Sequence, residues 1–130
     1  MSQNQPEELS PELLPVLIEL AHKLDSEKAY NIGLYDTSKQ SSAFSHVLLC
    51  TALSSLHMKK LAVEVESAMK SMGWRIYRQN PQNTESGWLP LDFGDFIVHI
   101  FSAEKREHYN LEQVISESDV INWETEQINE

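Results

Sequence analysis

Residues 88–101, WLPLDFGDFIVHIF, contain the side chains with the clearest potential for chemistry. They include Asp92-Phe93-Gly94, the triplet that holds magnesium in protein kinases. A kinase also needs a glycine-rich phosphate cover, a strand lysine and a catalytic-loop aspartate with its asparagine, and the sequence has none of these. We therefore interpret the triplet as a hairpin turn, in which Asp92 is a turn residue and Gly94 supplies an unusual backbone angle.

Other catalytic and metal-binding arrangements are also incomplete. Nucleotidyl transfer needs two carboxylates one residue apart on a strand, whereas Asp92 and Asp95 stand on either side of a turn. Cys50 and His57 could form a thiolate–imidazole pair, but Cys50 lies in an apolar run and is more simply a small core residue. Asp95 and His99 are too few ligands for a metal site, and a histidine hydrogen-bonded beside the sheet explains His99 better. There is no GxxxxGK or GxGxxG phosphate loop either. We expect no catalytic residue, metal or cofactor.

The composition restricts the kind of partner. The 130 residues carry 20 acidic and 10 basic side chains, a formal net charge of −10. Such a surface repels phosphate backbones, so we expect no direct nucleic-acid binding, and it suits a basic protein partner. The single cysteine, Cys50, excludes an internal disulfide and favours a reducing compartment, the cytoplasm. The first residues lack the pattern of a signal peptide, and no apolar run approaches the ~20 residues of a membrane helix.

The apolar periodicity predicts the elements that position these residues. After a disordered leader, residues 1–9, Ser10 caps a helix that ends at Asp25-Ser26, and Pro15 either kinks this helix or marks its true start. A second helix runs from Ser54-Ser55 to Gly73, and a third begins at Ser102 and passes Tyr109. The predicted strands are Tyr30–Tyr35, Phe44–Leu53, Trp74–Tyr77, Trp88–Leu91 and Phe96–Phe101. An acidic tail, residues 117–130, packs as a short helix or stays mobile.

These elements give the order α-β-β-α-β-β-β-α and predict an α/β (α+β) domain over residues 10–116, with a mixed five-stranded sheet flanked by helices. The second and third strands should form a parallel crossover through the long helix. Trp88 and Phe93 cannot both point inward together with Leu89 and Leu91 unless both faces of the sheet are covered. A helix layer covers one face, and we expect a partner chain on the other.

The same residues resemble the signature of the Iojap-like ribosomal silencing factors. Residues 88–101 match the family's tryptophan, its Asp-aromatic-Gly-Asp turn and its histidine-bearing strand, and residues 50–57, CTALSSLH, are similar to its passage from strand to long helix. The segment of Glu104, Arg106 and Tyr109 also matches. The chain departs from the family at Ala52, usually glycine, at Leu56, usually basic, and in the loop at residues 79–83.

The resemblance implies a nucleotidyltransferase-like fold without catalytic carboxylates, and a protein that is not an enzyme. It implies binding to the large ribosomal subunit through large-subunit ribosomal protein fourteen, on the face that meets the small subunit. Occupying that face blocks subunit joining and represses translation. The predicted partner-binding residues are Trp88, Leu91, Asp92, Phe93 and Tyr109. A homodimer is also implied. A degenerate nucleotide-binding enzyme and a plain dimeric scaffold remain alternatives.

Overall fold

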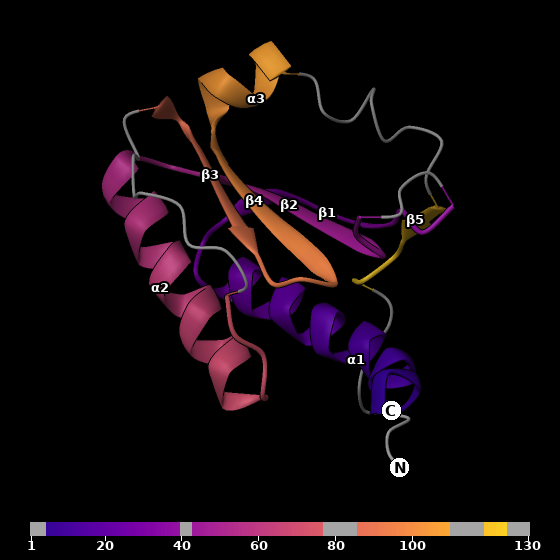
Figure 1. Ribbon diagram of the computed structural model, residues 1–130. Coiled ribbons are helices and arrows are strands. Elements are labelled where there is room, and N and C mark those ends of the chain that lie inside the picture. Colours follow the sequence, from indigo (N-terminus) through magenta and orange to yellow (C-terminus); the bar gives the residue numbers. More distant parts are fainter. Residues whose placement is uncertain (1–4, 40–42, 77–85, 110–118, 125–130) are drawn as a thin grey trace.

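The protein folds around one mixed sheet (Figure 1). The structure, a computed structural model, describes residues 5–39, 43–76, 86–109 and 119–124. The helices are α1 (Gln5–Ser26), α2 (Ser55–Ser71) and α3 (Ala103–Tyr109). The strands are β1 (Tyr30–Asp36), β2 (His46–Ala52), β3 (Trp88–Asp92), β4 (Phe96–Ser102) and β5 (Asp119–Ile121). The predicted α+β class and five-stranded mixed sheet are confirmed.

The sheet has the strand order β3-β4-β2-β1-β5. β2 and β4 run parallel at its centre, and every other neighbouring pair is antiparallel. The parallel neighbour of β2 is therefore β4, not the strand that follows the long helix directly. β3 lies antiparallel on the outer side of β4, as the predicted hairpin requires.

The fifth strand comes from a different part of the chain than predicted. Residues 74–76 form no strand, and Tyr77 lies outside the described residues. Instead, β5 in the acidic tail pairs with β1, so the expectation of a short helix or a mobile tail is wrong for residues 119–121. Trp123 explains the docking, because its side chain is buried and its indole Nε1–H donates to the carbonyl of Ile32 at 3.3 Å.

α1 is longer than the sequence indicated. It begins at Gln5 and so includes residues 5–9, which were expected to form a leader, and Pro15 lies inside the helix rather than at its start. A proline removes one backbone hydrogen bond from a helix. Burial of the stripe Leu13, Leu17, Leu20 and Leu24 compensates for this loss, because each such side chain contributes about 2 kcal/mol when fully removed from water.

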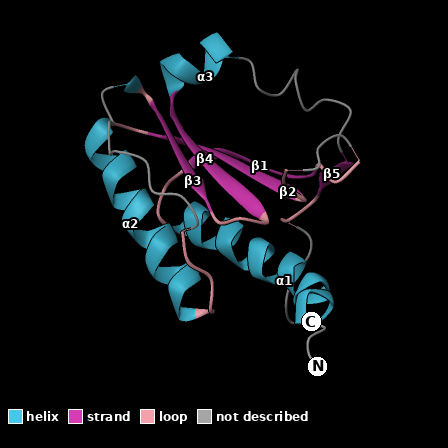
Figure 2. Ribbon diagram, viewed as in Figure 1, coloured by secondary structure: helices cyan, strands magenta, loops and turns pink. Residues whose placement is uncertain are grey.

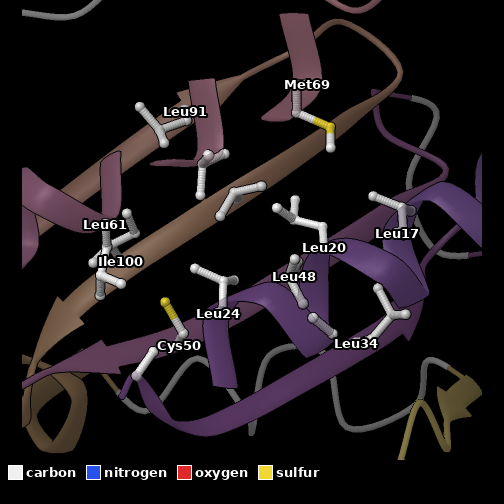
Figure 3. Close-up of a cluster of buried hydrophobic side chains, with 14 of the residues drawn as sticks. Leu17, Leu20, Leu24, Leu34, Leu48, Cys50, Leu61, Met69, Leu91 and Ile100 are labelled. Carbon is white, nitrogen blue, oxygen red and sulfur yellow. The ribbon is translucent and has the colours of Figure 1, made fainter. Parts of the chain in front are cut away.

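α1 and α2 both pack on one face of the sheet, and α3 lies at its end (Figure 2). The core between these helices and the sheet contains Leu20 and Leu24 of α1, Leu61 and Met69 of α2, and Leu48 of β2 (Figure 3). A second, smaller cluster lies on the opposite face and contains Val47, Leu49, Ile97 and Phe101. The sheet is therefore buried on both sides, as expected. The members of the second cluster are at most 9% exposed within the single chain, so burial of this face does not require the partner chain that we expected there.

Candidate partner-binding surface

Strand register separates the residues of β3 between the two faces of the sheet. Trp88 pairs with Phe101, Pro90 with His99 and Asp92 with Ile97. Directly opposed residues of an antiparallel pair point to the same face, so these six side chains lie on the face of the second cluster. Leu89 and Leu91 alternate with them and enter the core beneath α1 and α2. Trp88, Pro90 and Asp92 therefore lie on the side of the hairpin that faces away from α1 and α2.

Trp88, His99 and Phe101 form an aromatic group that we call the Trp88 cluster. The indole Nε1–H of Trp88 donates to Nδ1 of His99 at 2.9 Å. The Trp88 ring stacks on Phe101 with centroids 5.8 Å apart and lies 5.7 Å from the His99 ring. Phe101 is fully buried, whereas Trp88 and His99 are half-buried. The cluster thus holds a partly exposed tryptophan in one orientation by stacking and by a hydrogen bond.

The hydrogen bond fixes which ring nitrogen of neutral His99 carries the proton. Nδ1 accepts the indole proton, so the neutral ring carries its own proton on Nε2. Burial lowers the pKa of His99 to about 4, because desolvation disfavours the imidazolium. His99 is therefore a neutral acceptor at pH 7. The sequence interpretation of His99 as a hydrogen-bonded histidine beside the sheet is confirmed, but its partner Trp88 was not foreseen.

Two of the predicted partner-binding residues are not on the surface. Leu91 is 3% exposed and lies in the helix-covered core (Figure 3), and Phe93 is 4% exposed. Phe93 turns back into the core because its N–H donates to the carbonyl of Phe96 at 3.0 Å, which closes the turn. Its ring then stacks on Phe96 with a centroid distance of 5.0 Å. Both residues pack in the core on the helix side of the hairpin. Neither is available on the Trp88 face, and Phe93 borders only a depression on the α2 side, next to Trp74 and Ile76.

The turn between β3 and β4 confirms the interpretation of Asp92-Phe93-Gly94. Asp92 Oδ1 accepts the backbone N–H of Gly94 at 2.9 Å, and Gly94 has a φ of 93°. This is a left-handed conformation that glycine adopts without strain. Asp92 is half-buried beside Ile97, so it stays on the same face as Trp88. Tyr109 is the last residue of α3, and its side chain lies outside the described residues.

The thiolate–imidazole pair does not form. Cys50 is buried in the core, where desolvation raises its pKa to about 12. His57 uses both ring nitrogens elsewhere, since Nδ1 accepts the N–H of Leu53 and Nε2 bonds the carbonyl of Glu27, each at 2.8 Å. Among the described residues, no three His, Cys, Asp or Glu side chains are grouped closely enough to hold a metal ion. None of the described helices has the length and apolar character needed to cross a membrane.

One polar contact beside the Trp88 cluster was missed by sequence reasoning. Arg106 of α3 donates from Nη1 to Oγ1 of the buried Thr51 at 2.8 Å. Thr51 is the register partner of Phe101, so this bond ties α3 to the strands that carry the cluster. A basic side chain reaching back to a strand hydroxyl has no local sequence signal, because the two residues are 55 positions apart.

Comparisons with known proteins agree with this architecture. Residues 10–130 match the family described as "RsfS: Ribosomal silencing factor during starvation". A ribosomal silencing factor RsfS of Haemophilus influenzae is 30% identical over 95 residues, which cover 73% of this chain and 92% of that protein. The chloroplastic protein Iojap of Zea mays is 27% identical over 104 residues, covering 78% and 44% of the two chains. A crystal structure of a Chromobacterium violaceum protein superposes with a TM-score of 0.70 at 29% identity, covering 80% of this chain and 83% of that one.

The structure is that of a small α+β protein with one mixed five-stranded sheet and a partly exposed aromatic cluster on the face opposite α1 and α2. The chain belongs to the RsfS family of ribosomal silencing factors, the bacterial relatives of the plant Iojap proteins. Its family role is ribosome silencing.

Proposed function

We propose that this chain silences ribosomes by steric occlusion rather than by catalysis. It binds a basic protein, large-subunit ribosomal protein fourteen, on the intersubunit face of the large subunit. The bound domain then occupies the position that the small subunit needs, since one surface cannot pack against two partners at once. Translation stops because subunits cannot join.

The observation that carries this proposal is the fixed, partly exposed side chain of Trp88. Tryptophan is enriched among the residues that contribute most to protein–protein binding, and an anchor that is already ordered loses little entropy when it binds. Pro90 and Asp92 flank it on the same face, because both alternate with buried residues along β3. Tyr109 follows from the family resemblance as a further contact. Leu91 and Phe93 act indirectly, as the packed base of the hairpin.

The charge of the chain supports a protein partner rather than ribosomal RNA. A net charge of −10 repels the phosphate backbone that surrounds any site on the subunit. A basic protein embedded in that RNA attracts the acidic chain, and the surrounding phosphates disfavour its binding at other sites on the ribosome. The implied homodimer would use the same aromatic face, so binding to a second copy and binding to the subunit would compete.

The proposal is tested with Trp88→Ala. Purified large subunits are sedimented with the wild-type chain or the variant, and assembly is then measured by adding small subunits. Loss of a central anchor should weaken subunit binding by roughly 2 kcal/mol or more, about thirtyfold in Kd, and should restore whole ribosomes.

Val63→Ala provides the matched control, because Val63 is an exposed apolar side chain on α2, away from the Trp88 face. It should sediment with the subunit as the wild type does. Circular dichroism verifies that both variants are folded. If Trp88→Ala is folded and still prevents subunit joining at wild-type concentrations, the proposed surface is incorrect. If the wild-type chain does not sediment with large subunits, the proposed partner is incorrect.

A further inference from the structure

The outer side of α2 carries exposed aliphatic side chains that the core does not use. The buried side of this helix consists of Met58, Leu61, Ala62, Val65 and Met69. On the solvent side, Leu56 is 77% and Val63 is 61% exposed, and Leu53, just before the helix, is 65% exposed. Leu56 and Val63 are seven residues apart, so they lie two turns from each other along one line of the helix. These three residues are half of the large hydrophobic side chains that are exposed in the described part of the chain.

Two shallow depressions meet at Val63. One has a volume of about 500 Å³ and is lined by Leu56, His57, Lys59, Lys60 and Val63, together with Ser54. The other has a volume of about 580 Å³ and extends from Val63 past Lys70 to Arg75 and Ile76. Together they run along α2 as one apolar track, which we call the α2 groove.

The α2 groove is basic in a strongly acidic molecule. Lys59, Lys60, Lys70 and Arg75 line it, which is four of the 10 basic residues of the chain. Within the described part of the chain, Glu66 is the one acidic residue that lines it with them. Lys60 also bonds Glu27 of α1 at 2.9 Å, so it borders the groove on the side of α1. Lys59, Lys70 and Arg75 are exposed and direct positive charge outward.

We propose that the α2 groove docks an acidic amphipathic helix of another protein. Leucine-sized side chains seven residues apart on such a helix would match the spacing of Leu56 and Val63, and its carboxylates would meet Lys59, Lys70 and Arg75. RNA fits less well, because the most exposed side chains of the groove, Leu56 and Val63, are aliphatic, and the Trp74 ring at its end is already packed edge-on against Phe96. A second copy also fits less well, because a twofold contact would bring the same basic residues against one another.

This partner differs from the ribosomal protein proposed above in both charge and location. The α2 groove is on the outside of the helix layer, whereas the Trp88 cluster is on the opposite face of the sheet. The two surfaces can therefore be occupied at the same time. The chain would then connect a silenced subunit to a second, acidic protein.

The test uses a defined probe, a labelled synthetic helical peptide with leucine at positions i, i+3 and i+7 and glutamate at its other exposed positions. Binding to the full chain is measured by fluorescence anisotropy. Two control peptides have lysine in place of glutamate, or the same acidic composition in scrambled order. We expect the patterned acidic peptide to bind at least about tenfold more tightly than either control, since both the apolar spacing and the charge contribute.

Two double variants and one control locate the binding site. Leu56→Ser with Val63→Ser removes the apolar track, and Lys59→Glu with Lys70→Glu reverses its charge; each should weaken peptide binding at least about tenfold. Lys28→Glu reverses an exposed charge after α1 and should change binding less than about twofold. All altered side chains are exposed, so the thermal midpoint should stay near that of the wild type.

Equal binding by the wild type and both double variants would overturn the proposal, as would equal binding of the scrambled peptide. Self-association that Leu56→Ser abolishes would identify a second copy as the occupant and would also overturn it. A single-stranded RNA that displaces the peptide and binds more tightly than the peptide would also overturn the proposal. Sedimentation with large subunits should be unchanged in both double variants. Sedimentation with large subunits therefore tests the proposed function through Trp88→Ala. Peptide binding tests the α2 groove through the two double variants, so the two proposals can fail independently.

Discussion

His99 is the residue on which the order of the Trp88 surface depends. Its Nδ1 accepts the indole proton of Trp88, and this is possible only while that nitrogen is unprotonated. Burial lowers the pKa of His99 to about 4, below the ordinary value of 6.5. The unfolded chain therefore takes up a proton on this ring at a higher pH than the folded protein does.

This difference predicts a pH dependence of stability. Between pH 6.5 and about 4 the unfolded state binds more protons, so the free energy of unfolding decreases as pH falls through this window, by at most about 3 kcal/mol from His99. His99→Gln retains an acceptor for the Trp88 indole but does not titrate. Urea unfolding at several pH values should give a shallower decrease for the variant than for the wild type.

Burial also lowers the pKa of His46. Because His46 is present in both proteins, comparing their pH dependences cancels its contribution. Identical slopes for His99→Gln and the wild type would mean that His99 does not retain a depressed pKa. At pH 7 the two proteins should bind large subunits equally, because both hold the indole.

Among the elements, β5 contributes more than its three residues suggest. It pairs with β1 through Leu34, Tyr35 and Asp36, and Trp123 follows it into the core beside α1. The Trp123 ring lies edge-on to His22 of α1, with centroids 5.1 Å apart. The tail therefore joins β1 to the helix layer.

Trp123→Ala should lower the free energy of unfolding by about 3 kcal/mol, because it removes a large buried ring and leaves a cavity. Val120→Ala is the matched control in the same tail segment, since Val120 of β5 is 72% exposed and should change stability by less than about 0.5 kcal/mol. Chemical denaturation measures both. A Trp123→Ala protein as stable as Val120→Ala would show that the tail docks only weakly.

The limits of sequence reasoning follow from the range of the contacts involved. The strands at the centre of the sheet, helix α2 and the β3–β4 hairpin were predictable because apolar periodicity, the Ser54 cap and Gly94 are local signals. β5 was not, because Leu34 pairs with Ile121 from a distant part of the chain. Residues 74–76 alternate like a strand but form none, and Trp74 packs edge-on against Phe96 instead.

The sequence also predicted part of the arrangement of side chains around Trp88. Alternation along β3 places Trp88 and Asp92 on one face and Leu89 and Leu91 on the other, and the direction of Trp88 follows from that rule. Phe93 departs from alternation because it belongs to the turn, so its direction depends on the bond to Phe96 rather than on spacing. The choice of His99 as the partner of Trp88 required the register of two strands.

At the scale of the whole molecule, charge is distributed unevenly. The net charge is −10, yet four basic residues line the α2 groove. The acidic remainder should attract a basic ribosomal protein at close range, where that protein is nearer than the surrounding phosphates. Attraction of this kind is screened by salt.

Subunit binding should therefore weaken as salt rises. Increasing potassium chloride from about 0.05 M to about 0.5 M shortens the screening length from more than about 10 Å to less than about 5 Å. Sedimentation with large subunits across this range should show a steady loss of bound protein as the contact between opposite charges is screened. Binding that strengthens with salt would indicate that repulsion by the surrounding phosphates outweighs attraction to the basic protein.

Pro90 lies in β3, an outermost strand of the described sheet, and proline has no backbone N–H to offer a further strand. At the opposite border, β5 has only three residues and begins with Asp119. Both borders are thus poor templates for strand addition. A partner cannot readily extend this sheet, so molecules that recognise the protein must lie across a face or along a helix, and fibre-like stacking through the borders is disfavoured.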